Sequence, residues 1–188
     1  LDLAKMPDQL SLLNLLKFNG YQTSFYYGGD ANFDRMKQYL QANHVDEIRD
    51  EKTFPTGYLK LPSINGFSWG YNDKELFRYF LSSRTITQNL KPQLSVILTV
   101  STHNPFIINE SEKYAQVLEK QMNSLKFDES RKQLYKKYKD QYASILYMDD
   151  AVQMFFKEYK KRPDYENTIF IITGDHRMPE IPMSTKID

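Results

Sequence analysis

The sequence predicts a three-layer α/β fold with a mostly parallel central sheet. Three short runs have the apolar, β-branched composition of buried strands: residues 21–27, 94–101 and 168–174. Amphipathic patterns alternate with these runs, as in sheets that carry helices on both faces. We expect those helices near residues 8–18, 31–43, 72–83 and 130–161, whereas the pattern over 109–129 fits one helix or two.

Composition limits the class of protein. The chain has 188 residues, of which 40% are hydrophobic, so residues 1–188 are predicted to form a single folded domain. The net charge of +1 argues against a broadly basic binder of nucleic acid. The absence of cysteine excludes disulfides, a cysteine nucleophile and cysteine-based zinc sites within this sequence.

The last apolar run, Thr168–Thr173, leads through Gly174 to Asp175 and His176. Open α/β sheets place their chemistry beyond the carboxyl ends of such strands. Gly174 is expected to let the backbone turn so that both side chains face one point. A carboxylate beside an imidazole suits a divalent cation such as Zn²⁺ or Mn²⁺. The alternative is that Asp175 caps the next segment and His176 lies on the surface.

A second histidine follows the run near 94–101, in the sequence Thr102-His103-Asn104-Pro105-Phe106. A lone histidine after a strand is more often structural than functional. Two strand ends that each present a histidine favour convergence on one site, so we expect His103 to belong with Asp175 and His176.

Two further motifs precede these. Trp69, the only tryptophan, lies in Gly66–Gly70 before an amphipathic helix that starts near Asp73; its alternative role is a core aromatic beside a loop. Gly28-Gly29 hints at a phosphate-binding loop, but the pair is more simply a structural turn at the rim of the sheet. In that case Asp30 or Asn32 caps the following helix.

Residues 131–139 are locally basic with interleaved aromatics, a composition that also occurs in surfaces for RNA or anionic lipid. Apolar residues at helical spacing favour a solvated face opposite a core stripe. The stripe is predicted to contain Leu134, Tyr138, Tyr142, Ile145, Val152, Phe156 and Tyr159.

Taken in order, the motifs resemble the alkaline-phosphatase superfamily, and within it the sulfatase-like domain of lipoteichoic acid synthases and phosphoglycerol transferases. The segment that begins at Tyr165 and runs to His176 is similar to the family's strand ending in Gly-Asp-His. The resemblance implies that Asp175 and His176 bind one catalytic divalent metal; manganese is the preferred ion, with zinc, magnesium and calcium as alternatives. It also implies that His103 faces the substrate's phosphate or leaving group and that Trp69 borders the substrate pocket.

The activity that this resemblance implies is metal-dependent transfer of a phospholipid head group, phosphoglycerol, through a threonine nucleophile. Water or a glycan hydroxyl would then accept the group. Sulfatases share the fold and the Asp-His signature, so hydrolysis of sulfate esters on a sulfated or phosphorylated glycan is the nearest alternative. A non-catalytic α/β binding module that retains the family fold is the alternative from another class.

In the family, the nucleophile and an acidic metal ligand precede the segment similar to Leu10–Lys17. The sequence is therefore expected to be an internal fragment, truncated at both ends, that is inactive and binds metal poorly on its own. The resemblance places the parent enzyme on the extracytoplasmic face of the cell membrane, with membrane association through segments outside this chain.

Overall fold

The computed structural model describes residues 10–84 and 91–181, which form two compact units. The first unit comprises the described residues up to Lys60 together with Ile64–Val100, and the second comprises Leu61–Ser63 and the described residues from Ser101 onward. That these residues act as one domain stays a prediction.

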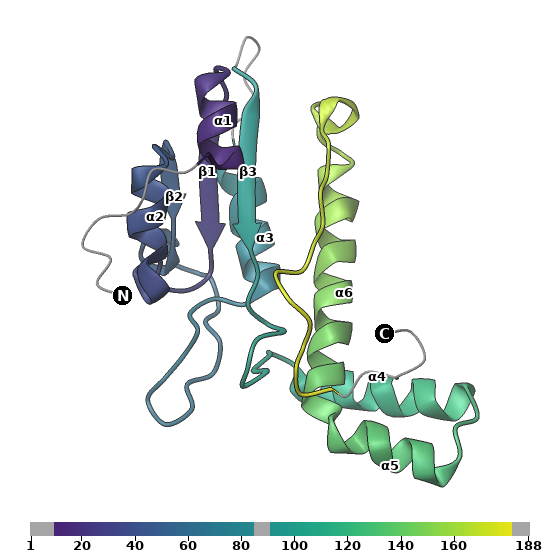
Figure 1. The fold of residues 1–188 in the computed structure, drawn as a ribbon. Helices are drawn as coiled ribbons and strands as arrows, with labels where there is room; N and C mark the ends of the chain where they lie inside the picture. Colours follow the sequence, from purple (N-terminus) through teal and green to yellow (C-terminus); the bar gives the residue numbers. More distant parts are fainter. Residues whose placement is uncertain (1–9, 85–90, 182–188) are drawn as a thin grey trace. The chain divides into compact units, whose positions relative to one another are not determined.

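A three-stranded parallel sheet forms the centre of the first unit (Figure 1). Strand β1 (Gln22–Tyr27) lies between β2 (Glu47–Arg49) and β3 (Gln93–Leu98). The strands predicted near 21–27 and 94–101 are thus confirmed. Strand β2 was not predicted, because its sequence, Glu-Ile-Arg, contains no apolar run.

Three helices belong to the same unit: α1 (Leu12–Phe18), α2 (Met36–Ala42) and α3 (Asp73–Ser83). Helix α1 begins with a capping box, in which Ser11 accepts a hydrogen bond from the Asn14 amide while the Asn14 side chain accepts one from the Ser11 amide. Helices α1 and α3 both contact the central strand β1. The predicted helices near 8–18 and 72–83 are confirmed in position, although residues 8 and 9 lie outside the described part.

The helix predicted near 31–43 is interrupted at its start. Phe33–Arg35 form a short 3-10 turn, η1, before α2, and Asp34 and Arg35 both have left-handed backbones, with φ of 48° and 60°. The Asp30 carboxylate accepts hydrogen bonds from the Asn32 amide and side chain at 2.9 and 2.7 Å. Asp30 therefore stabilises the turn that precedes the helix rather than the helix terminus itself.

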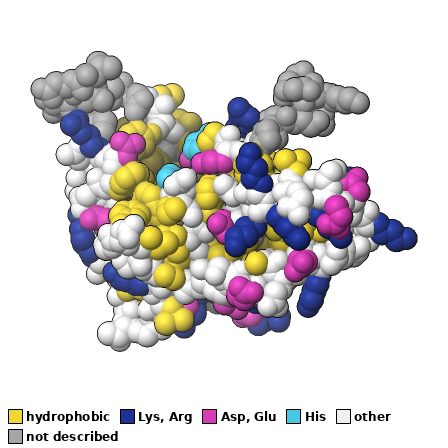
Figure 2. Space-filling model, turned by 90° about the horizontal axis from the view of Figure 1, so that it is seen from below, with side chains coloured by type: hydrophobic (Ala, Val, Ile, Leu, Met, Phe, Trp, Pro, Cys, Tyr) yellow, Lys and Arg dark blue, Asp and Glu magenta, His cyan; other side chains and the backbone are white. Residues whose placement is uncertain are grey.

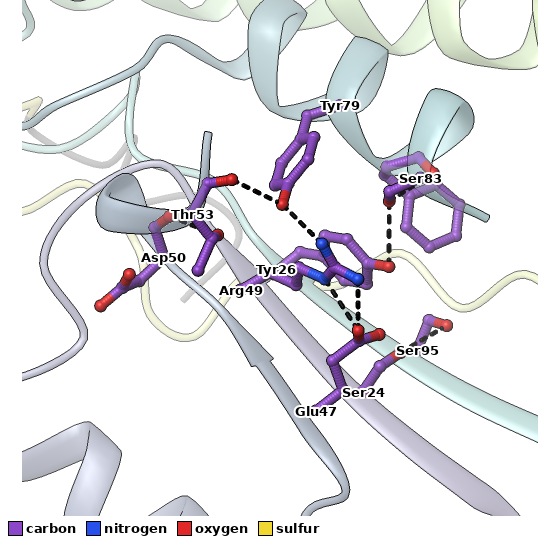
Figure 3. A network of polar contacts seen from close by, with 10 residues as sticks. Ser24, Tyr26, Glu47, Arg49, Asp50, Thr53, Tyr79, Ser83 and Ser95 are labelled. Carbon is purple, nitrogen blue, oxygen red and sulfur yellow. Dashed lines mark hydrogen bonds and ion pairs between the residues drawn. The ribbon is translucent and has the colours of Figure 1, made fainter. Parts of the chain in front are cut away.

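A network of hydrogen bonds joins β2 to α3 (Figure 3). The Arg49 guanidinium donates to the Tyr79 hydroxyl at 2.8 Å and, through Nε, to Glu47 at 2.9 Å. Tyr79 in turn donates to the carbonyl of Thr53, in the short turn η2 (Glu51–Thr53), at 2.9 Å. Burial alone would lower the pKa of Arg49, but its hydrogen bonds with Tyr79 and Glu47 outweigh burial and raise it. The network holds the sheet edge to the helix that covers it.

The second unit contains helices α4 (Ser111–Ser124), α5 (Glu129–Lys137) and α6 (Lys139–Tyr159). Helices α4 and α6 pack against each other, with Tyr114 and Tyr147 in edge-to-face contact at 5.4 Å between ring centroids. The region 109–129 thus contains one complete helix, α4, and α5 begins at its last residue, Glu129. The helix predicted near 130–161 is two helices, because the backbone breaks at Tyr138. No helix in the described ranges is long and apolar enough to cross a membrane.

The predicted core stripe of residues 134–159 is confirmed only in part: Tyr159 is 1% exposed, and Tyr138, Tyr142, Val152 and Phe156 are half-buried. Leu134 is 50% exposed and Ile145 is 42% exposed. The residues that α6 buries are Ala143, Ser144, Tyr147, Ala151, Phe155 and Tyr159.

The buried parallel strand predicted near 168–174 is also not observed. The segment is extended but belongs to no described sheet, and Ile169, Ile171 and Ile172 are 89%, 79% and 68% exposed. Phe170 packs against the rings of Phe156 and Tyr159, at 4.9 and 5.0 Å between centroids. A β-branched run is buried on both faces only where a sheet receives it, and this segment lies against α6 instead.

Candidate functional site

The turn after β1 lies at the rim of the sheet, where the backbone of Gly28 closely contacts the backbone of Gly70 and Tyr71. A Cβ atom on Gly28 would lie 2.2 Å from the Tyr71 carbonyl oxygen, and one on Gly70 would lie 2.2 Å from the Gly28 carbonyl oxygen. The Tyr71 amide donates to the Gly28 carbonyl at 2.8 Å. Gly70 also has a φ of 89°, which favours glycine. These contacts support the structural interpretation of Gly28-Gly29 over the phosphate-binding one.

The same contact places Trp69 beside the end of β1. A Cβ atom on Gly29 would lie 2.9 Å from the Trp69 carbonyl oxygen. The half-buried Trp69 ring meets Phe33 and Phe67 edge to face, at 5.3 and 4.9 Å between centroids, and Phe33 is 52% exposed. Trp69 therefore belongs to an aromatic cluster at the surface of the first unit.

Asp73 is a buried carboxylate that the sequence analysis did not single out. It follows Asn72, which caps α3 by accepting a hydrogen bond from the Glu75 amide at 3.0 Å. The Asp73 carboxylate accepts a hydrogen bond from the Val100 amide at 2.9 Å. Asp73 thus fixes the chain just after β3, three residues before His103. The only sequence pattern that pointed to this residue was an aspartate directly after a helix N-cap. That pattern is common and is therefore weak evidence for a special role.

His103 lies on the exposed turn that follows β3. Its Nδ1 atom is 2.7 Å from the carbonyl oxygen of Asn104, and its own carbonyl accepts from the Phe106 amide at 2.7 Å. The ring is thus held by local contacts while the residue as a whole stays open to solvent.

Asp175 and His176 form an exposed pair, with 78% and 65% of their side chains accessible. The His176 amide donates to the Asp175 carboxylate at 2.8 Å, and His176 Nε2 lies 3.8 Å from Asp175 Oδ2. Gly174 does not have a positive φ, and a Cβ atom there would meet only the His176 carbonyl oxygen, at 3.5 Å. The expected steric need for glycine at position 174 is therefore not borne out.

The Asp175 carboxylate and the His176 imidazole, 3.8 Å apart, are donor groups of the kind that would hold a divalent cation. Within residues 10–84 and 91–181, no three His, Asp or Glu side chains come together as a metal site. A complete coordination shell would need further ligands.

The four predicted residues are distributed over both units. His103, Asp175 and His176 belong to the second unit, and Trp69 belongs to the first. Their convergence on one site stays a prediction. The parallel sheet and the helices that pack on it define the class: an α/β protein.

Comparison with known proteins identifies the family. A family model described as Sulfatase matches residues 4–179, and the chain therefore belongs to the sulfatase family. A solved protein of the alkaline phosphatase superfamily from Vibrio parahaemolyticus shares the fold, with a TM-score of 0.57 and 27% identity over 82% of this chain. The alkaline-phosphatase-like fold predicted from the motifs is thus confirmed.

Curated relatives include lipoteichoic acid synthase 2 of Bacillus subtilis, which is 24% identical over 163 residues, or 86% of this chain. Phosphoglycerol transferase I of Escherichia fergusonii is 21% identical over 171 residues, or 90% of this chain. The chain spans 22% and 20% of the lengths of these two relatives, and 32% of the solved Vibrio protein.

Proposed function

We propose that this chain is part of a metal-dependent enzyme that transfers the phosphoglycerol head group of a phospholipid. The observation that carries the proposal is the exposed Asp175–His176 pair, in which a carboxylate and an imidazole lie 3.8 Å apart and would hold a divalent ion. The names of the relatives support the substrate class, since they include lipoteichoic acid synthases and phosphoglycerol transferases. The proposed location is the extracytoplasmic face of a membrane.

In this proposal Asp175 and His176 hold the metal, with manganese preferred, and the remaining ligands and the nucleophile lie outside this chain. When bound, the metal supplies Lewis-acid stabilisation of charge on the phosphate. Carboxylate oxygen and imidazole nitrogen are ligands that manganese and zinc both accept.

His103 and Trp69 would act on the substrate. The imidazole of His103, on an exposed turn, suits contact with a phosphate oxygen or proton donation to the departing alkoxide, since imidazole serves as a general acid in many enzymes. Trp69, half-buried between Phe33 and Phe67, would present an apolar wall to the glycerol moiety. Asp73 would act only by positioning, through the Val100 amide.

Sulfate-ester hydrolysis is the second candidate, because the matching family model is described as Sulfatase. A sulfate ester presents a tetrahedral group similar to a phosphate ester, so the same metal pair and histidine would serve both. Release of a labelled head group from phosphatidylglycerol, compared with hydrolysis of an aryl sulfate, separates the two activities in a longer polypeptide from the same reading frame. Neither activity in that polypeptide would favour a non-catalytic module.

The first prediction concerns the metal. Titration calorimetry with Mn²⁺ and Zn²⁺ should show weak binding to the chain, and binding at least about tenfold tighter to the longer polypeptide that supplies further ligands. Asp175→Ala and His176→Ala should each abolish the tight binding, because each removes a ligand atom.

The matched control is His44→Asn, which removes a histidine of the first unit; asparagine tolerates the positive φ of 55° at that position. Its metal binding should be unchanged. Tight binding that survives both Asp175→Ala and His176→Ala would refute the proposed ligand assignment.

A further inference from the structure

Residues 125–139, here called the α5 surface, concentrate positive charge. They contain six basic and two acidic side chains, a net charge of +4, whereas the whole chain carries +1 and the rest therefore −3. Figure 2 shows Lys and Arg side chains over the helices of the second unit, with hydrophobic and acidic ones between them. The basic residues of the α5 surface are Lys126, Arg131, Lys132, Lys136, Lys137 and Lys139.

Local contacts use the two acidic side chains and leave most of the cations without a carboxylate partner, although Lys137 lies 5.3 Å from the centroid of the Tyr138 ring. Asp128 caps α5, accepting from the Arg131 amide and the Ser130 hydroxyl at 2.8 Å each. Glu129 pairs with Lys132 at 3.0 Å. In the described part of the chain, no carboxylate lies within ion-pair distance of the remaining lysines of this surface: Lys126, Lys136, Lys137 and Lys139.

Aliphatic side chains are exposed among these cations. Helix α5 buries none of its residues, and Leu134 is 50% exposed. Leu134 lies one helical turn from both Arg131 and Lys137, so the three share one side of α5. Leu125, in the turn before α5, is 64% exposed. The α5 surface therefore combines unpaired positive charge with uncovered aliphatic groups.

The aromatic rings of the surface are already occupied. Tyr135 stacks on Tyr142 of α6 with 4.6 Å between centroids and 17° between planes. Phe127 packs on Tyr135 at 5.1 Å, and the Arg131 guanidinium lies 4.0 Å above the Phe127 ring. Binding of single-stranded nucleic acid depends on open rings on which bases stack. A ligand that contacts the exposed aliphatic groups and is attracted to the positive charges of the surface fits better.

We infer that the α5 surface binds the surface of an anionic phospholipid bilayer. Amphipathic helices at such surfaces present lysine and arginine to the head groups and leucine to the boundary of the acyl chains. Each cation near an anionic membrane strengthens binding severalfold. The inference rests on the charge and exposure of α5 alone and stands independently of the proposed catalytic activity.

The test is flotation of the chain with vesicles of equimolar phosphatidylglycerol and phosphatidylcholine, and with vesicles of phosphatidylcholine alone. Binding is expected only to the anionic vesicles and should decrease as salt is added. The double variant Lys136→Glu/Lys137→Glu should bind at least about tenfold more weakly, because it reverses two of the contributing charges. Leu134→Asn should reduce binding about fivefold, because the variant lacks the leucine that reaches the boundary of the acyl chains.

The matched control is Lys157→Glu/Lys160→Glu, which makes the same charge change at the end of α6 among exposed lysines of the same unit. It should bind vesicles as the unaltered chain does. Equal losses in the two double variants would reduce the effect to net charge and overturn the inference. No binding to anionic vesicles, or tight binding to a DNA oligonucleotide that Leu134→Asn leaves unchanged, would also overturn it.

The absence of cysteine allows a second measurement. In Leu134→Cys, an environment-sensitive dye attached at residue 134 should report an apolar environment when anionic vesicles are added. The same dye in Ile145→Cys, at a residue of α6 that is 42% exposed, should not respond. A response at residue 145 alone would place the contact elsewhere and refute the assignment to α5. Circular dichroism of each variant verifies that the helices are retained.

Discussion

At the scale of single residues, Tyr27 shows how burial changes chemistry at the end of β1. Its side chain is 3% exposed. Burial, followed by the nearby carboxylates of Asp30, Asp73 and Glu51, raises the pKa of Tyr27 to about 12. All of these effects oppose a negative charge on the phenol oxygen, so the folded protein keeps Tyr27 neutral well above the ordinary tyrosine pKa of about 10.

This pKa predicts a loss of stability at high pH. The pKa of Tyr27 is higher in the folded than in the unfolded protein. Its contribution to the free energy of unfolding is therefore fully present below pH about 10 and is lost as pH rises toward about 12. Tyr27→Phe should remove this loss, which is on the order of 2 kcal/mol at the alkaline end. Denaturant unfolding at a series of alkaline pH values would measure it. If both proteins lost stability in parallel, another group would be responsible.

The site residues illustrate two different kinds of sequence signal. Asp175, His176 and His103 were singled out because metal-capable side chains follow apolar runs, and that signal needs no knowledge of neighbours. Asp73 was missed because its importance lies in a hydrogen bond to Val100, 27 residues away in the sequence. No local pattern encodes such a partner.

At the scale of elements, Asp46 ties α1 and β1 to the segment that enters β2. Its carboxylate pairs with Lys17 and accepts from the Thr23 amide and hydroxyl at 2.8 and 3.0 Å. Burial favours protonation of this carboxyl, but the hydrogen bonds from Lys17 and Thr23 outweigh burial and lower the pKa of Asp46.

The lowered pKa predicts sensitivity to acid. Because the folded pKa is below the unfolded value of about 3.9, the stabilising contribution is present above that value and is lost as pH falls through the folded pKa. Asp46→Asn should cost about 1 kcal/mol near neutral pH, because the pair with Lys17 is partly exposed, and almost nothing in strong acid. Urea unfolding of both proteins from neutral pH into acid measures the difference; a cost that does not vary with pH would contradict this account.

The turn between β1 and η1 depends on close backbone approach. Because a Cβ atom on Gly28 would lie 2.2 Å from a backbone oxygen, Gly28→Ala should destabilise the first unit by about 3 kcal/mol. Thermal unfolding followed by circular dichroism would measure the loss. Gly57→Ala is the control, since a Cβ atom there meets nothing within 4 Å and only its φ of 90° opposes the change. A smaller cost at Gly28 than at Gly57 would refute the packing argument.

At the scale of the whole molecule, the chain belongs to the sulfatase family and has a parallel α/β sheet in its first unit. The second unit is built mainly from α4 and α6, and its extended segment 168–173 leaves three isoleucines exposed. Exposed β-branched residues in an extended segment are able to pair with another strand. The Asp175–His176 pair lies at the end of this segment.

Sequence and tertiary structure determined different things about this protein. The sequence by itself predicted β1, β3 and α3, because their apolar periods and turn residues are local properties, and it predicted the family through motifs that include Gly-Asp-His. Tertiary structure decided what local patterns cannot encode. Strand β2 forms because β1 offers it a partner, Asp73 is buried and accepts a hydrogen bond from the Val100 amide, and α5 buries none of its residues, so Leu134 stays exposed. Burial and strand pairing depend on which segments contact each other in the folded chain, and composition alone does not specify those contacts.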